Sequence, residues 1–154
     1  MFTIKKQVTE RGLTVELQGS LEEQLTLEEQ IGEFKGDLMV NCRGITRLNS
    51  VGVKMWMRYF QTLKNRGVNF KFAECPPAIV EQLNLISNFS CGGEVLSILL
   101  PFSCDKCAND FVANVSTQEL KANQLILPKV KCEKPDCGAQ FDDDPSEYLY
   151  FLED

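Results

Sequence analysis

The chain has 154 residues, of which 44% are hydrophobic and 25% are charged, values typical of a soluble globular protein. Its net charge is −6, and it lacks histidine, which removes the commonest general base and every Ser–His or Cys–His nucleophile pair within the chain. No apolar run approaches the roughly 20 residues that span a bilayer, and the first residues lack the apolar core of a secretory signal. We therefore expect a cytoplasmic protein without membrane contact, whose seven cysteines are metal ligands or buried thiols.

The charges are unevenly distributed along the chain. Residues 38–73 contain seven basic residues and no acidic one, whereas residues 16–37 contain seven acidic residues and one lysine. One interpretation is a local cationic surface for an acidic partner or a phosphate. The other is that these are solvated faces of helices and strands whose sign is incidental.

The first predicted elements are strands and a weak helix. Alternation of apolar and polar residues over residues 2–8 and 13–18 predicts two strands with a turn at residues 10–12. The next predicted elements are a helix over 21–34, a buried strand over 37–42 and a loop over 43–49.

The clearest predicted helix begins at Asn49 or Ser50, either of which is a suitable N-cap, and ends near Gly67. Its apolar residues recur at steps of three and four: Val53, Trp56, Met57, Phe60 and Leu63. The opposite face carries Lys54, Met55, Arg58 and Tyr59. Met55 and Tyr59 either belong to a partner-binding surface or are covered by another part of the chain.

The following segment continues the alternation of strands and helices. Residues 68–74 predict a strand, Pro76 and Pro77 open a helix, and residues 94–102 predict a final apolar strand. This order predicts an α/β fold, a mixed β-sheet with helices packed on one side. The composition shifts after Phe102, where cysteines and turn residues become more frequent, so we expect one domain over residues 1–101 and a second module over 102–154.

Three segments, GLTVELQGSLE, DLMVNCRGITRLNSVGVKMW and GVNFKFAECPPAIVEQLNL, resemble the STAS domain, the fold of anti-sigma-factor antagonists and of the cytoplasmic tails of sulfate transporters. The resemblance covers residues 2–100. Its most specific piece is Asn49-Ser50-Val51-Gly52, which is similar to the family's Asp-Ser-Ser/Thr-Gly stretch. The resemblance implies that Ser50 is the phosphate acceptor of a partner switch kinase. Asn49 and Val51 depart from the family pattern, and an asparagine caps a helix as well as an aspartate does.

A phosphate on Ser50 fits elementary electrostatics, because helix N-termini favour negative charge. Lys54 and Arg47 are placed to pair with it. The alternative is that Ser50 or Asn49 is only an N-cap. We therefore expect a partner-binding surface around Ser50 whose residues are Arg47, Asn49, Lys54, Met55 and Arg58.

A second pattern is a set of four cysteines: Cys104, Cys107, Cys132 and Cys137. The first pair has two intervening residues and the second has four; together the two loops can bring four thiolates to one ion, and predicted strands over 111–115 and 125–130 would carry them. The pattern resembles a zinc ribbon and predicts structural Zn²⁺, since four sulfur ligands leave no open coordination position. A redox pair at Cys104 and Cys107 is the alternative.

The remaining cysteines and the tail have simpler interpretations. Cys42 and Cys91 are expected to be packing residues, and Cys75, ahead of a predicted helix, is either a packing residue or a reactive thiol. Asp144, Pro145 and Glu147 have the spacing of a capping box, so the tail is predicted to be a short terminal helix or an extended arm that packs its apolar residues on the ribbon.

The function that follows best is a non-enzymatic regulatory protein that acts by protein–protein interaction through a STAS-like surface and is switched at Ser50. The resemblance implies a switch kinase or an anti-sigma-type regulator as partner. A transcription-associated protein that binds nucleic acid through the zinc ribbon is the alternative, disfavoured by the acidic C-terminal module. An enzyme is disfavoured because no nucleophile–base pair is visible.

Overall fold

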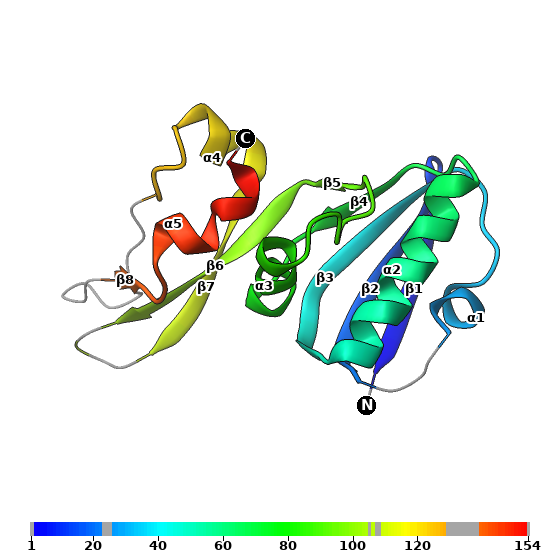
Figure 1. Cartoon of the computed structure of the whole chain (residues 1–154), viewed down its shortest axis with the longest axis horizontal. Helices are drawn as coiled ribbons and strands as arrows, with labels where there is room; N and C mark the ends of the chain where they lie inside the picture. The colour runs from blue at the N-terminus through cyan, green and yellow to red at the C-terminus, as the bar shows by residue number, and fades with distance from the viewer. Residues whose placement is uncertain (1, 23–25, 105, 107–108, 129–138, 154) are drawn as a thin grey trace.

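The structure is a computed structural model that describes residues 2–22, 26–104, 106, 109–128 and 139–153. The described strands form two sheets (Figure 1). The first sheet contains β1 (Thr3–Thr9), β2 (Gly12–Leu21), β3 (Asp37–Leu48), β4 (Phe70–Ala73) and β5 (Glu94–Val95). Its connecting helices are α1 (Leu27–Ile31), α2 (Ser50–Asn65) and α3 (Pro77–Leu85).

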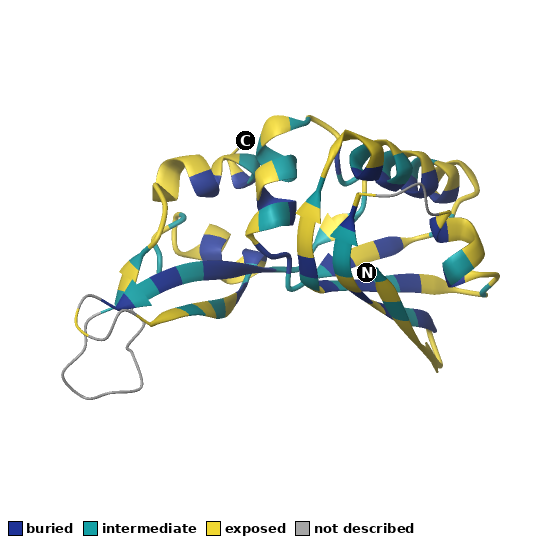
Figure 2. Ribbon diagram, turned by 90° about the horizontal axis from the view of Figure 1, so that it is seen from below, coloured by how far each residue is buried: buried dark blue, intermediate teal, exposed yellow. Residues whose placement is uncertain are grey.

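The first sheet has the strand order β1-β2-β3-β4-β5, with β1 antiparallel to β2 and the other neighbours parallel. Each crossover moves to the next strand in the same direction, and right-handed crossovers then place the three helices on one face. Burial follows this arrangement, because Leu13, Val15 and Leu17 are buried while Glu16 and Gln18 are exposed. Figure 2 shows buried and exposed positions along the strands. The prediction of an α/β fold with a mixed sheet is confirmed.

Aromatic rings form the centre of the core beneath α2. Trp56 stacks on Phe89 with ring centroids 5.2 Å apart, and its indole N–H donates to the Phe89 carbonyl at 3.1 Å. Phe60 contacts Phe70 and Phe72 of β4 at 5.1 and 5.0 Å. The predicted stripe therefore faces the core, and burial of several large rings contributes roughly 1.5–3 kcal/mol for each side chain.

Two predicted boundaries near the start of the chain are wrong. The helix expected over residues 21–34 is α1, only Leu27–Ile31, and residues 23–25 lie outside the described residues. The loop expected over residues 43–49 is instead the second half of β3, which continues to Leu48. Register shifts opposite β2 let β3 continue past the polar residues that suggested a loop.

The single strand predicted over residues 94–102 is also wrong, because the chain changes sheets at Leu96. Its N–H donates to the Phe72 carbonyl of β4 at 2.7 Å, and its own carbonyl accepts from Thr117 N–H at 3.0 Å. The next strand, β6 (Ser97–Cys104), belongs to the second sheet. The domain division predicted at residue 102 falls inside β6.

The second sheet is antiparallel, with β6 between β7 (Asp110–Ser116) and β8 (Ala139–Phe141). The strand predicted over 111–115 is confirmed within β7. The strand predicted over 125–130 is wrong for residues 125–128, where Leu125 has a left-handed φ of 63°, and residues 129–130 lie outside the described part. α4 (Thr117–Ala122) precedes this segment, and Ser116 caps it by accepting from Gln118 N–H at 3.1 Å.

The C-terminal segment packs on both parts of the molecule, through α5 (Pro145–Tyr148) and a 3₁₀ turn, η1 (Tyr150–Leu152). Asp144 caps α5, as predicted, by accepting from Ser146 N–H at 2.9 Å. The Tyr148 hydroxyl donates to the Leu99 carbonyl of β6 at 2.6 Å. Asn84 of α3 donates to the Tyr148 carbonyl at 3.0 Å and accepts from Phe151 N–H at 2.8 Å. The segment therefore joins α3 to the second sheet.

Candidate partner-binding site at the start of α2

Asn49 joins the start of α2 to the end of β2. Its Oδ1 accepts from Gly52 N–H at 3.0 Å, which satisfies one of the free donors of the helix N-terminus. Its Nδ2 donates to the Glu22 carbonyl at 3.1 Å, and its backbone N–H donates to the Leu21 carbonyl at 3.3 Å. The predicted N-cap is confirmed, and both ends of the Asn49 amide are used within the chain.

Gly52 is required at this junction for a reason that the sequence did not reveal. A Cβ atom on Gly52 would lie 1.8 Å from the Leu21 carbonyl oxygen and 2.7 Å from its carbon. The first turn of α2 therefore rests directly on the backbone of β2. The glycine of the Asn-Ser-Val-Gly stretch has a packing role that fixes where the helix begins.

Ser50 is the first residue of α2 and is exposed. Because Asn49 supplies the side-chain cap, the helix keeps its N-cap whatever happens to the Ser50 hydroxyl. Lys54, one turn along, is also exposed. Arg47 instead faces Glu22, with 3.7 Å between Nε and Oε1, and its side chain remains 75% exposed.

A hollow of about 520 Å³ lies between α1 and α2, and we refer to it as the α1–α2 hollow. Leu27 and Glu28 contribute from α1, and the α2 residues include Val51, Lys54, Met55, Arg58 and Tyr59. Three of the predicted partner-binding residues therefore line the α1–α2 hollow: Lys54, Met55 and Arg58. Arg47 and Asn49 do not line it; Arg47 borders a different hollow beside α3 and α5.

Tyr59 and Met55, which the sequence left open, differ in exposure. Tyr59 is 8% exposed, and its ring makes an edge contact with Phe60 at 5.1 Å. Burial, with a smaller contribution from the Glu28 carboxylate, raises the pKa of Tyr59 to about 12. Met55 is half-buried and lines the hollow. Tyr59 is therefore a buried residue in the wall of the α1–α2 hollow, whereas the Met55 side chain is accessible to solvent.

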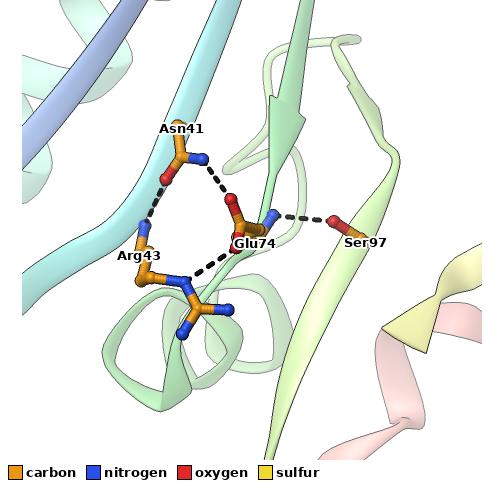
Figure 3. Close-up of polar contacts among 4 residues, drawn as sticks. All are labelled: Asn41, Arg43, Glu74 and Ser97. Carbon is orange, nitrogen blue, oxygen red and sulfur yellow. Dashed lines mark hydrogen bonds and ion pairs between the residues drawn. The ribbon is translucent and has the colours of Figure 1, made fainter. Parts of the chain in front are cut away.

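A polar cluster that sequence reasoning missed links β3 to Glu74, the residue after β4, and to the start of β6 (Figure 3). Glu74 accepts from Arg43 Nε at 2.7 Å and from the Asn41 side-chain amide, and its backbone N–H donates to Ser97 Oγ at 2.8 Å. Glu74 has a left-handed φ of 52°. The Arg43 hydrogen bond holds the pKa of this carboxyl below its usual range. The cluster secures the point where the chain changes sheets.

Cys104 is the one predicted zinc ligand within the described residues; Cys107, Cys132 and Cys137 lie outside them. It ends β6, is 3% exposed, and its N–H donates to the Asn109 carbonyl at 3.0 Å, which closes the loop between β6 and β7. Strand pairing sets Cys104 opposite Ala139, which follows Cys137 by two residues in the sequence. No group of three metal-ligating side chains occurs among the residues that the structure describes.

Cys42, Cys75 and Cys91 are fully buried. Burial, and after it the contact with Cys75, raises the pKa of the Cys42 thiol well above its usual value. The Cys75 backbone bonds to Ser97 and Leu99 of β6, at 3.1 and 2.8 Å. Cys91 Sγ donates to the Met57 carbonyl at 3.6 Å. These positions fit the packing roles expected for Cys42 and Cys91, and Cys75 lies where the two sheets meet.

No protein-family model and no curated protein matches this sequence. The similarity to the STAS domain and to a zinc ribbon therefore rests on the quoted residues. Among the helices in the described ranges, none combines the length and apolar composition needed to cross a membrane.

Proposed function

We propose that the protein is a non-enzymatic regulator with a STAS-like domain, which binds a protein partner through the start and outer face of α2. The observation that carries the proposal is the exposed Ser50 at the first position of a 16-residue helix whose side-chain cap is provided by Asn49. A hydroxyl in this position is accessible to a kinase. Its modification leaves the Asn49–Gly52 bond in place.

Phosphorylation of Ser50 would change the charge of the surface rather than the fold. A phosphoserine carries about −1.5 to −2 charge at pH 7. At a helix N-terminus this charge is favoured by the free N–H groups and by the helix dipole. Lys54, one turn further along, supplies a cation. The expected consequence is loss or exchange of the partner while the domain stays folded.

We propose further that Zn²⁺ holds the end of the second sheet through Cys104, Cys107, Cys132 and Cys137. In support, β6 ends at Cys104, and its pairing partner Ala139 lies just after Cys137 in the chain. Four thiolates would close the coordination sphere, so the ion would stabilise the fold and take no part in chemistry.

Affinity purification from the native host tests the regulatory proposal. Ser50→Asp should lose a partner that the wild type and Ser50→Ala retain, and Ser87→Asp, an exposed serine in the loop after α3, should retain it. Each variant is first compared with the wild type by circular dichroism and thermal unfolding. The proposal is contradicted if Ser50→Asp and Ser87→Asp capture the same partners as the wild type.

A further inference from the structure

We propose that the α1–α2 hollow binds an acidic amphipathic helix of a partner protein. This inference rests on the proposed function and adds the chemistry of the partner. The two faces of the binding helix would meet different parts of the hollow. Its apolar side chains would enter the hollow, and its carboxylates would meet the cations at the rim.

The apolar residues of the hollow that come from α2 lie on one face of that helix. Val51 and Met55 are one turn apart on α2, so they lie on the same face of the helix. Val51 is 37% exposed and Met55 is half-buried, which leaves both accessible from solvent. Leu27 and Tyr59 are buried and complete the apolar wall. Methionine adapts its shape to different partners, and an apolar groove beside a helix suits a second amphipathic helix.

The charged residues of the hollow favour a partner with negative charge. Lys54 and Arg58 are also one turn apart, both are exposed, and neither forms an ion pair with any residue that the structure describes. Their only acidic counterpart among the described lining residues is Glu28 on α1. Residues 38–73 contain no acid, so the surrounding part of α2 adds no further negative charge. A partner with carboxylates next to its apolar face would satisfy both cations.

The same arrangement explains how Ser50 would control binding. Ser50 precedes Lys54 by one turn, so a phosphate there would compete with the partner's carboxylates for the lysine. It would also repel the rest of an acidic helix. Phosphorylation would therefore release an acidic partner, and it would strengthen the binding of a basic one. The sign of the partner's charge therefore decides whether phosphorylation weakens or strengthens its binding.

Peptide binding to the full-length protein tests the charge selection. The probe is a fluorescently labelled amphipathic peptide of about 16 residues, roughly four helical turns, with leucines on one face and glutamates on the other. The matched probe replaces each glutamate by lysine. We expect the glutamate peptide to bind more tightly than the lysine peptide at low salt. Equal or tighter binding of the lysine peptide would overturn the proposal.

Variants locate the binding site. Lys54→Glu/Arg58→Glu should weaken binding of the glutamate peptide by about tenfold or more, since charged pairs at a rim depend on both partners. The charge-matched control Lys35→Glu/Lys121→Glu changes two exposed lysines elsewhere and should bind almost as the wild type does. Met55→Asp should also weaken binding through the apolar face. Unchanged binding by Lys54→Glu/Arg58→Glu would overturn the proposal.

The native partner separates this inference from the proposed function. A partner that is lost from Ser50→Asp but retained by Lys54→Glu/Arg58→Glu would overturn the hollow as its site and leave the switch intact. Loss from Lys54→Glu/Arg58→Glu with full retention by Ser50→Asp would support the hollow and contradict the Ser50 switch. Loss from both variants, with retention by both control variants, supports the two proposals together.

Discussion

The backbone of Gly52 in α2 lies directly against the carbonyl group of Leu21 in β2, with no room for a side chain between them. Together with the bond from Gly52 N–H to Asn49, this contact sets the position of the helix start and of Ser50. The position of the accessible Ser50 is therefore set by the packing of α2 against β2.

Gly52→Ala should destabilise the protein, by about 1–3 kcal/mol, because the added methyl group forces the helix and strand apart. Alanine has the higher intrinsic helix propensity, by about 1 kcal/mol, so propensity alone predicts the opposite sign. Urea unfolding followed by circular dichroism measures the difference, and Ser50→Ala is the control on the neighbouring exposed position. A variant as stable as the wild type would show that α2 does not rest on β2.

Tyr59 should make the protein sensitive to alkaline pH. Its pKa is raised by burial to about 12 in the folded protein, whereas an exposed tyrosine ionises near 10. The stabilisation is fully present below pH 10 and is lost as the pH rises through 12, because the unfolded chain releases its proton first. Tyr59→Phe should lose less stability than the wild type between pH 9 and 11, measured by urea unfolding at each pH. An identical pH dependence of the two proteins would contradict the burial of this hydroxyl.

Glu74 should contribute to the loss of stability in acid. Its hydrogen bond from Arg43 holds its pKa below the usual range, so the stabilisation is present above the ordinary glutamate pKa. It is lost as the pH falls through the lowered value. Glu74→Gln should therefore show a smaller decrease in stability on acidification. Glu94→Gln, which removes the carboxylate of the exposed Lys71–Glu94 pair, is the charge-matched control, and equal acid sensitivity of Glu74→Gln and the wild type would contradict this role of Glu74.

The four-cysteine proposal predicts about one zinc ion per chain in protein purified without chelator. Cys104→Ser should bind less zinc, whereas Cys91→Ala, which changes a buried cysteine beneath α2, should retain it. Elemental analysis gives the zinc content, and thermal unfolding with and without chelator gives its effect on stability. Wild-type protein without zinc, or Cys104→Ser with a full complement, would contradict the metal site.

The sequence predicted the parts of the fold that depend on local periodicity. α2 has a strong apolar stripe and an N-cap, and both appear where expected, as do the first hairpin and the helix opened by the two prolines. The change of sheet at Leu96 was not predictable, because a continuous apolar run does not show which strand each residue pairs with. α1 was predicted too long, and so the hollow between it and α2 could not be foreseen.

The candidate site also contains residues that local sequence patterns predict and contacts that they do not. Ser50 and Asn49 follow from the rules for helix caps, and Lys54, Met55 and Arg58 follow from the helical repeat. The close contact of Gly52 with Leu21 and the bond from Arg43 to Glu74 join residues about thirty positions apart in sequence. Such contacts depend on the tertiary arrangement of strands, and a single sequence gives no local signal for them.

If Ser50 is a phosphate-accepting switch, part of the protein in its native host carries a phosphate there, and mass spectrometry detects it. Trypsin cleaves after Arg47 and Lys54, and the peptide between them, LNSVGVK, has Ser50 as its only hydroxyl residue. A phosphate on this peptide is therefore assigned without ambiguity. If Ser50 is the switch, the phosphorylated fraction of this peptide should be lower in protein that carries its bound partner than in free protein. Complete recovery of this peptide without phosphate under all growth conditions would contradict the Ser50 switch.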